Sequence, residues 1–260
     1  MLTIDFVPGA PNWLDLGTPD VDAAAAFYRE LFGWEFQSAG PDAGGYGFFR
    51  LGDRVVAAAG LLTEEGARSA WTLYFHTTDA QATTKAVEQA GGTVRFGPFD
   101  VFTAGRMAGF TDPTGADFAV WEPADVAGLE EVTAPGTLCW TELYTTDASA
   151  AKDFYRSVFS WDLRDVDFGP GYTLVTPSGG GQDAQHGGIM QLQPENLAAG
   201  TTSDWHPYFE VIDCDTTAAR AAEHGATALI APMDAENVGR LAMFTDPFGA
   251  TFAVITSAMV

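Results

Sequence analysis

Residues 13–20 read Trp13-Leu14-Asp15-Leu16-Gly17-Thr18-Pro19-Asp20, and the pattern returns as Trp140-Thr141-Glu142-Leu143-Tyr144-Thr145-Thr146-Asp147. The two copies begin at residues 13 and 140, which is an offset of 127. The same offset carries Phe27-Tyr28-Arg29 onto Phe154-Tyr155-Arg156. Because self-similarity at a fixed spacing is the signature of a repeated structural unit, the chain is predicted to consist of two related halves.

A second pair of segments lies further along each half, at residues 71–75 and 205–209, with an offset of 134. This offset also relates Phe110-Thr111-Asp112-Pro113 to Phe244-Thr245-Asp246-Pro247. The offsets of 127 and 134 differ by seven residues, so the second half contains an insertion between its two blocks. We expect this insertion at the glycine-rich stretch 178–181.

All four blocks follow one plan. A short strand ends at an aspartate that can cap the helix after it, and these aspartates are Asp20, Asp79, Asp147 and Asp213. An alanine-rich helix follows and is expected to end at Gly33, Gly91, Ser160 or Gly225. Three short strands complete each block, and two of the blocks carry Asp-Pro turns at 112–115 and 246–249. The sequence therefore predicts an α+β protein built from four βαβββ modules.

The domain boundaries follow from the repeat and from composition. Residues 123–135 are rich in Pro, Ala, Gly and acidic residues with little periodicity, which indicates a linker. We expect one domain at 1–122, this linker, and a second domain at 136–260.

The charge and composition exclude several classes of partner. The net charge of −23 repels phosphate backbones, which argues against nucleic acid. Hydrophobic residues make up 47% of the chain, but no run reaches the roughly 20 apolar residues of a membrane helix. Two cysteines are too few for a disulfide framework, and no signal peptide is predicted at the N-terminus. We therefore expect a cytoplasmic protein that contacts neither membranes nor nucleic acid.

The helix segments 22–34 and 147–161 and the two Asp-Pro-x-Gly-x-x-Phe hairpins resemble the vicinal oxygen chelate superfamily. This superfamily includes glyoxalase I, bleomycin-resistance proteins and extradiol dioxygenases. The chain is most similar to its two-domain actinobacterial, glyoxalase-like members, which are often labelled hydroxylases. The resemblance implies that pairs of modules form two incomplete barrels, each around a cavity.

The resemblance also implies where a metal would bind. Metal-binding members place a His on the first strand of a module and a Glu on its last strand. The first-strand positions fall here on Trp13, Thr72, Trp140 and His206, and the Glu positions on Ala119 and Ala253. Only His206 is a ligand type, and a divalent site needs three or more N or O donors. We therefore predict no metal site and no cofactor.

Strand alternation predicts which side chains line the cavity, because residues two positions apart point to the same face. The expected ligand-binding residues are Trp13, Asp15, Tyr74, His76, Trp140, Tyr144 and Tyr208. The expected catalytic residues, if a reaction takes place, are His206, Glu210 and Glu142. His206 and Glu210 share a strand face and could form an acid–base pair. Such aromatic walls suit a flat aromatic or hydrophobic ligand held by stacking and a few hydrogen bonds.

Other residues have plainer interpretations. Trp71 and Trp205 are expected to fill the core. His186, beside the glycine-rich loop, is expected to be exposed. Arg106 and Arg240 each follow a glycine at a strand start and could form local salt bridges or meet an anionic ligand.

Two functions remain open on the sequence. The first is a resistance, sequestration or carrier protein that binds a small aromatic molecule without metal. The second is a metal-independent acid–base enzyme, hydroxylase-, lyase- or isomerase-like, of small-molecule or secondary metabolism. A rearranged metal site with His206, Glu210 and Glu142 is a third version. The expected state is a monomer or homodimer, and modules could pair as one with two and three with four, or as one with four and two with three.

Overall fold

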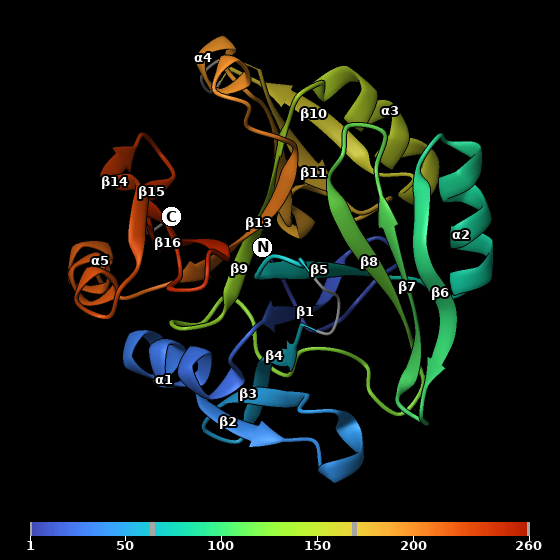
Figure 1. The fold of residues 1–260 in the computed structure, drawn as a ribbon. Helices are drawn as coiled ribbons and strands as arrows, with labels where there is room; N and C mark the ends of the chain where they lie inside the picture. The colour runs from blue at the N-terminus through green and yellow to red at the C-terminus, as the bar shows by residue number, and fades with distance from the viewer. Residues whose placement is uncertain (1, 63–65, 168–170, 259–260) are drawn as a thin grey trace. The chain divides into compact units, whose positions relative to one another are not determined.

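The computed structural model describes residues 2–62, 66–167 and 171–258 and contains four β-α-β-β-β runs (Figure 1). The first is β1 (Pro11–Thr18), α1 (Val21–Phe32), β2 (Glu35–Ser38), β3 (Gly47–Leu51) and β4 (Arg54–Leu61). The second is β5 (Ala70–His76), α2 (Ala80–Gln89), β6 (Thr93–Val101), β7 (Gly105–Thr111) and β8 (Asp117–Pro123). The third is β9 (Leu138–Thr145), α3 (Ala148–Phe159), β10 (Asp162–Val166), β11 (Tyr172–Thr176) and β12 (Gly187–Gln191). The fourth is β13 (Asp204–Glu210), α5 (Cys214–Glu223), β14 (Thr227–Ala235), β15 (Gly239–Thr245) and β16 (Thr251–Ser257).

Short helices connect some of these elements: η1 (Pro41–Ala43), η2 (Gln182–Ala184) and α4 (Pro194–Ala198). Each module contributes four neighbouring strands to a sheet, in the orders β2-β3-β4-β1, β5-β8-β7-β6, β10-β11-β12-β9 and β13-β16-β15-β14. The first strand of every module pairs in parallel with the last strand, and the other neighbours within a module are antiparallel. The predicted α+β class with four βαβββ modules is confirmed.

The helix starts confirm the capping residues expected from sequence. Asp20, Asp79, Asp147 and Asp213 each accept a hydrogen bond from a backbone N–H in the first turn of the following helix. Gly33 ends α1 in the left-handed conformation at φ 75°, and Ser160 ends α3 at φ 55°. The same backbone turn thus closes both helices, although only glycine adopts it without steric cost.

The insertion in the third module lies where the sequence placed it. In the first module, β3 and β4 are joined by Gly52 and Asp53 alone. In the third, the corresponding strands β11 and β12 are joined by residues 177–186, which include the glycine-rich stretch and η2.

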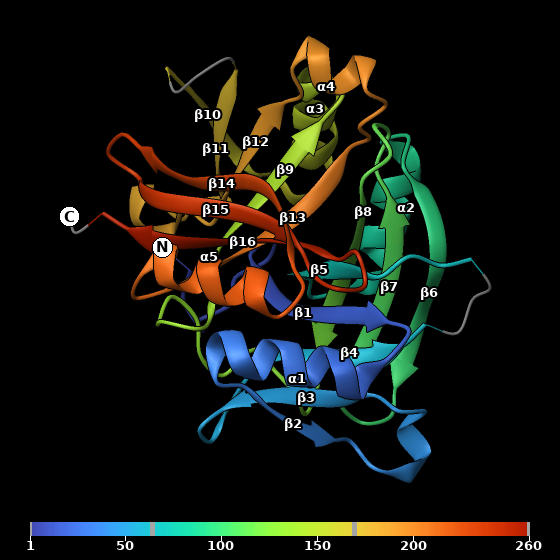
Figure 2. The same ribbon diagram turned by 60° about the vertical axis from the view of Figure 1, so that its left-hand side comes forward.

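The chain divides into two compact units. Unit 1 comprises Met1–Trp13, Thr72–Gly128 and Thr141–His206, and unit 2 comprises Leu14–Trp71, Leu129–Trp140 and Pro207–Val260. Most of the first and fourth modules therefore lies in unit 2, and most of the second and third lies in unit 1. The first residues of β1, β5, β9 and β13 fall in the other unit. Within unit 2, α1 and α5 lie side by side (Figures 1 and 2). Within unit 1, α2 packs against α3 in the same way.

A chain of buried hydrogen bonds crosses the core of unit 2. The indole N–H of Trp71 donates to the Tyr28 hydroxyl at 3.0 Å, and Tyr28 donates to Asp246 at 3.1 Å. Asp246 also accepts from the backbone N–H groups of Phe248 and Ala250, which closes the β15–β16 turn. Burial raises the pKa of Tyr28 well above its usual value, so the phenol keeps the proton that it donates.

Unit 1 contains the same chain at the equivalent positions. Trp205 donates to Tyr155 at 2.7 Å, and Tyr155 donates to Asp112 at 3.0 Å. Asp112 in turn accepts from the backbone of Thr114 and Ala116. Trp71 and Trp205 are both buried, as expected, and each donates to the tyrosine that joins a helix to a hairpin turn.

His186 contradicts its sequence-based prediction. It was expected in an exposed position but is 1% exposed, and its ring packs against Phe75 and Trp161 in unit 1. Burial lowers its pKa to about 3, so the ring is neutral at physiological pH. The prediction failed because His186 is the last residue before β12, and its backbone already bonds to Val175 and Thr141 on the neighbouring strands.

Segment 123–135, predicted as a linker, forms hydrogen bonds with residues outside it near both of its ends. In unit 1, the Trp121 indole donates to the Val126 carbonyl at 2.8 Å. In unit 2, the backbone N–H of Glu130 bonds to Val55, and the Val55 N–H bonds to the Glu130 carboxylate. Across the described residues, none of the helices has the length and apolarity required to span a bilayer.

Candidate functional site

One face of the third module carries a row of polar and aromatic side chains in unit 1. Glu142 on β9 is in register with Gly188 on β12, and Tyr144 is in register with Met190. Met190 is in turn in register with Tyr172 on β11. Glu142 and Tyr144 share this face because they are two residues apart, while Leu143 between them is fully buried on the other side. We call Glu142, Tyr144, Tyr172 and His206 the Glu142 wall.

A hydrogen bond joins the acid of this wall to a tyrosine that the sequence analysis missed. The Tyr172 hydroxyl donates to Glu142 Oε2 at 2.9 Å, and the two residues are 8% and 6% exposed. The Tyr172 ring crosses Gly188 to reach the carboxylate, and a Cβ atom at position 188 would overlap the phenol. The Tyr172–Glu142 hydrogen bond therefore requires a glycine at position 188.

His206 completes the Glu142 wall. Its ring lies against Tyr144 with centroids 5.1 Å apart. Its Nε2 lies 3.4 Å from Asp204 Oδ2, and its Nδ1 is buried without a hydrogen-bond partner. The structure thus brings together three of the predicted site residues, Glu142, Tyr144 and His206.

The first module carries an equivalent arrangement in unit 2. Asp15 on β1 is in register with Ala58 on β4, which is in register with Phe48 on β3. The Tyr46 hydroxyl donates to Asp15 Oδ2 at 3.1 Å, and the Tyr46 ring lies against Phe48. We call Asp15, Tyr46 and Phe48 the Asp15 wall. Its acid and tyrosine are half-buried rather than buried.

Strand register shows that the two acid–tyrosine pairs are equivalent. Tyr172 lies two residues before Leu174, which is in the same register row as Glu142. Tyr46 lies two residues before Phe48, which is in the same register row as Asp15. A Cβ atom at Gly60 would meet the Tyr46 ring, so each tyrosine again lies over a glycine. A sequence signal existed: both tyrosines follow a glycine, as Gly45-Tyr46 and Gly171-Tyr172. Their offset is 126, within one residue of the repeat offset of 127.

Glu210 uses its carboxylate to hold a strand end in unit 2. It accepts hydrogen bonds from the backbone N–H and the hydroxyl of Ser257, at 3.0 and 2.5 Å. The neighbouring Cys139 is buried, and burial followed by the Glu210 charge raises the pKa of its thiol. The predicted catalytic role of Glu210 remains a prediction.

The remaining predicted ligand-binding residues lie on the first strands of their modules. Trp13, Tyr74 and His76 belong to unit 1, and Trp140 and Tyr208 belong to unit 2. Burial lowers the pKa of His76, and its Nδ1 is buried without a hydrogen-bond partner. A surface groove in unit 2 is lined by Ala23, Ala26, Phe27, Glu30, His224, Pro247 and Phe248, and contains none of the predicted residues.

The residues at the family's metal positions do not fit a metal ion. Ala119 and Ala253 stand where the glutamates would be, beside Tyr74 and Tyr208 in strand register. Within residues 2–62, 66–167 and 171–258, no three His, Cys, Asp or Glu side chains gather as a metal-binding group would. One imidazole cannot hold a divalent ion that needs three or more donors.

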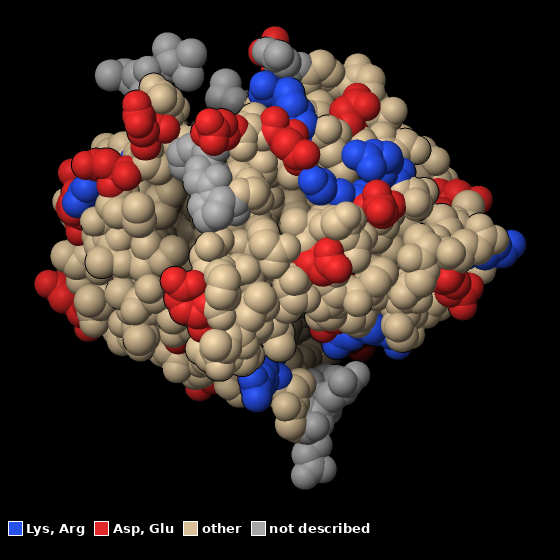
Figure 3. All heavy atoms as spheres, turned by 90° about the horizontal axis from the view of Figure 1, so that it is seen from above, with Lys and Arg blue, Asp and Glu red and all other residues tan. Residues whose placement is uncertain are grey.

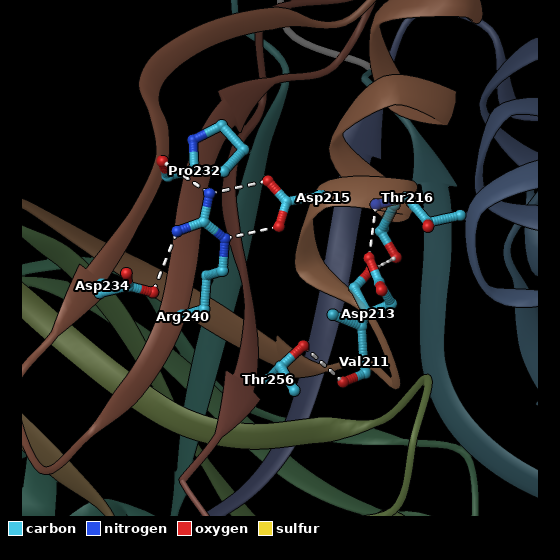
Figure 4. Close-up of polar contacts among 9 residues, drawn as sticks. Val211, Asp213, Asp215, Thr216, Pro232, Asp234, Arg240 and Thr256 are labelled. Carbon is cyan, nitrogen blue, oxygen red and sulfur yellow. Dashed lines mark hydrogen bonds and ion pairs between the residues drawn. The ribbon is translucent and has the colours of Figure 1, made fainter.

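The two arginines that follow glycines form local ion pairs. Arg240 holds Asp215 through two contacts of 2.6 and 2.8 Å and Asp234 through one of 3.0 Å (Figure 4). Arg106 forms an ion pair with Asp100 at 2.7 Å. Both arginines therefore have structural partners, which is one of the two roles expected for them.

Family models match both halves of the chain. Residues 10–120 match the glyoxalase/bleomycin resistance protein/dioxygenase superfamily, and residues 140–255 match a glyoxalase-like domain. The chain belongs to this superfamily, also called the vicinal oxygen chelate superfamily. The predicted assignment, with its two glyoxalase-like incomplete barrels, is confirmed.

Similar proteins cover nearly the whole chain. The anthracycline biosynthesis protein DauV of Streptomyces sp. (strain C5) is 40% identical, over 96% of this chain and 94% of that protein. CFP32 of Mycobacterium bovis is 36% identical, over 98% of this chain and 97% of that protein. Among solved structures, the 2,3-dioxygenase LapB of Pseudomonas sp. KL28 has a TM-score of 0.64 at 14% identity, over 97% of this chain and 94% of that one. At that identity, the likeness to LapB concerns the fold alone.

Proposed function

We propose that this protein binds a planar aromatic small molecule of secondary metabolism without a metal ion, as a sequestration or carrier protein. The observation that carries the proposal is the Glu142 wall, where the rings of Tyr144 and His206 pack together beside the buried Glu142–Tyr172 pair. Aromatic faces hold flat ligands by stacking, and a few placed polar groups fix their orientation.

Two further observations support this function. The side chains at the family's metal positions are mostly tryptophan, threonine and alanine, so His206 is the one imidazole among them, too few donors for the superfamily's metal chemistry. In addition, DauV is named for the biosynthesis of anthracyclines, which are polycyclic aromatic compounds. A ligand of that ring size matches walls made of aromatic side chains.

The test is a binding titration with an anthracycline. Chelator-treated protein is titrated into daunorubicin, and binding is followed by the fluorescence anisotropy of the drug. We expect a Kd in the micromolar range or below and a loss of about tenfold for Tyr144→Ala, since stacking contributes roughly 1 kcal/mol. The control is Phe102→Ala, which removes an aromatic ring that is 80% exposed in the same unit.

Three outcomes of this titration would contradict the proposal. Absence of binding at millimolar protein would rule out this ligand class. Binding that depends on added divalent metal would rule out the metal-free site. An equal loss in Tyr144→Ala and Phe102→Ala would show that the wall is not the binding surface.

A metal-independent acid–base enzyme is the second candidate. It is favoured by the buried Glu142 carboxylate and by the unpartnered His206 Nδ1, since two such groups can exchange a proton with a bound ligand. If Glu142→Gln and His206→Ala abolish conversion of a bound ligand while leaving its affinity unchanged, the protein is an enzyme and the carrier role is wrong.

A further inference from the structure

We infer that unit 2 carries a second ligand site, a surface groove beside α1 that binds small apolar amines. The groove lies between α1, the end of α5 at His224 and the β15–β16 turn at Pro247 and Phe248, and its volume is about 450 Å³. Small-molecule sites typically measure roughly 300–1,000 Å³. We call it the α1 groove. It is independent of the Glu142 wall, which lies in unit 1.

One face of α1 forms a side of the groove. Its four residues there are spaced at i, i+3, i+4 and i+7, which places them on one side of a helix: Ala23, Ala26, Phe27 and Glu30. The two alanines are exposed, whereas Phe27 is only 4% exposed. Small exposed side chains beside a buried aromatic ring leave a hollow lined by carbon atoms.

A single methyl group distinguishes this place from its equivalent in unit 1. There, a Cβ atom at Gly92 would lie 2.9 Å from the ring of Phe154, so the glycine lets this ring approach α2. Unit 2 has Phe27 in place of Phe154 and Ala226 in place of Gly92. Gly92 and Ala226 both donate their backbone N–H at 2.9 Å to the carbonyl five residues earlier, so their backbones are equivalent. The Ala226 methyl group therefore prevents Phe27 from lying as Phe154 does, which leaves room for a ligand.

Other positions of the groove have polar counterparts in unit 1 that bond within the protein. Phe248 corresponds to Thr114, whose hydroxyl donates to Asp112 at 2.8 Å. Glu30 corresponds to Ser157, whose hydroxyl donates at 2.7 Å to a backbone carbonyl of its own helix. Unit 2 instead places an aromatic ring and a carboxylate at the groove, and apolar surface next to one charge is typical of a ligand site.

The charge at the groove favours a cation. Among the described residues, no salt bridge involves the exposed Glu30 carboxylate. The nearby Arg220 donates to the Glu30 backbone carbonyl at 3.1 Å. In addition, α5 ends at His224, and a helix C-terminus carries partial negative charge.

The charge of the whole chain works in the same direction. The net charge of −23 attracts cations at long range and repels anions. Figure 3 shows acidic side chains scattered over the face in view. An ammonium group beside Glu30, attached to an apolar ring system that covers the alanines and Phe248, matches both the charge and the carbon lining of the groove.

The test compares three naphthalenes of similar shape and different charge: 2-naphthylmethylamine, 2-naphthylmethanol and 2-naphthoate. Wild-type protein labelled with ¹⁵N at alanine and phenylalanine is titrated with each compound in low salt, and amide NMR shifts give the affinity. The amine should bind with a Kd near the millimolar range, as is usual for a small ligand, and should shift the amides of Ala23, Ala26 and Phe248. The alcohol should bind about threefold more weakly, because an ion pair at an exposed site is worth a factor of up to about five, and the carboxylate more weakly still.

Two pairs of variants assign the site. Ala23→Trp fills the groove and should abolish the shift of the Phe248 amide with the amine and the alcohol alike. Ala82→Trp places the same ring on α2, at an exposed position with the same aspartate cap, and should bind as wild type does. Glu30→Gln should lower the affinity for the amine about threefold and leave that for the alcohol unchanged. Glu88→Gln, at an exposed position of α2, removes the same charge and should change neither.

Several outcomes would overturn the inference. Equal affinity for the amine and the alcohol would do so, as would an equal loss in Glu30→Gln and Glu88→Gln. Amide shifts confined to residues outside the groove, or undiminished shifts in an Ala23→Trp protein that circular dichroism shows to be folded, would overturn the site. If Ala23→Trp does not fold, the comparison of Glu30→Gln with Glu88→Gln decides. Binding of daunorubicin at the Glu142 wall is measured separately, through Tyr144→Ala.

Discussion

Units 1 and 2 share one set of buried polar contacts and differ in another. The Trp–Tyr–Asp chain is the same in both, with Trp205, Tyr155 and Asp112 in unit 1 and Trp71, Tyr28 and Asp246 in unit 2. The acid–tyrosine pair on the walls differs in its acid, its burial and its supporting glycine.

The difference shows which contacts a duplicated protein is free to change. Each member of the Trp–Tyr–Asp chain satisfies the next, so the loss of one leaves a buried group without a partner. The acid–tyrosine pair of each wall is a single hydrogen bond that supports no other step of a chain, so its acid and its burial can differ between the units. Under the proposed function, this difference is where ligand binding would differ between the units.

The largest expected effect comes from breaking the shared chain. Asp112→Ala removes the acceptor of Tyr155 and of the backbone at Thr114 and Ala116. We expect the free energy of unfolding to fall by about 4 kcal/mol, because hydrogen bonds to a charged group contribute 1.5–3 kcal/mol each and their donors stay buried. Urea unfolding followed by tryptophan fluorescence measures the loss.

Asp246→Ala provides the comparison in unit 2, since Asp246 holds Tyr28 and two backbone N–H groups in the same way. The decrease in the free energy of unfolding caused by Asp246→Ala should match that of Asp112→Ala within about 1 kcal/mol. If only one of the two substitutions lowered the free energy of unfolding substantially, the two Trp–Tyr–Asp hydrogen-bond chains would not stabilise their units equally.

A buried imidazole distinguishes the core around the third module from the core around the first. His186 occupies a strand position where the first module has Val56, and both are buried. Because the folded-state pKa of about 3 lies below the ordinary 6.5, protonation favours the unfolded chain as the pH falls. Stability from this group is full above pH 6.5 and declines toward pH 3, by roughly 3 kcal/mol between pH 7 and pH 4.

His186→Val tests this because it places at residue 186 the valine that the first module has at the equivalent position. The free energy of unfolding of the variant and the wild type is measured by urea titration at a series of pH values. The advantage of the variant should grow as the pH falls, whereas His224→Ala, at an exposed position, should track the wild type. A constant difference between His186→Val and wild type would show that the ring does not titrate on unfolding.

The repeat made the fold predictable, because helix caps and Asp-Pro turns depend on local sequence. Asp20, Asp147 and Gly33 act where local chemistry placed them. The pairing of modules into compact units was not predictable, because it is decided by contacts between residues far apart in sequence, such as Tyr28 and Asp246.

The candidate site was predicted in part. Strand alternation found Glu142, Tyr144 and Asp15, since period-two geometry follows directly from sequence. It missed Tyr172 and Tyr46, which reach the acids from two strands away across a glycine. Cross-strand contacts of that kind depend on the register between neighbouring strands, which alternation along a single strand does not reveal.

A smaller effect is expected from the tyrosines of the two walls. Tyr172→Phe removes a hydrogen bond between buried groups and should lower the free energy of unfolding by about 1.5 kcal/mol. Tyr46→Phe removes the equivalent bond at a half-buried site, where water replaces the phenol, and should cost about 0.5 kcal/mol. Thermal unfolding of both variants measures the difference, and equal losses would contradict the unequal burial of the pairs.

The smallest effect is expected at the surface arginines, which differ between the units in their number of partners. Arg240 forms ion pairs with Asp215 and Asp234 (Figure 4). Among the described residues, Arg106 forms an ion pair with Asp100 alone. Arg240→Ala should therefore lower the melting temperature more than Arg106→Ala, and salt should shrink both effects because exposed charges are screened.

The pH dependence of this effect identifies its origin. Hydrogen bonding to Arg240 lowers the pKa of Asp215, so the stability from this pair is present above the ordinary aspartate pKa and is lost as the pH falls through the lowered value. The difference between Arg240→Ala and wild type should vanish in acid and should be absent in an Asp215→Ala, Asp234→Ala background. A difference that persists in that background would mean that the arginine stabilises β15 by packing of its side-chain carbons rather than by charge.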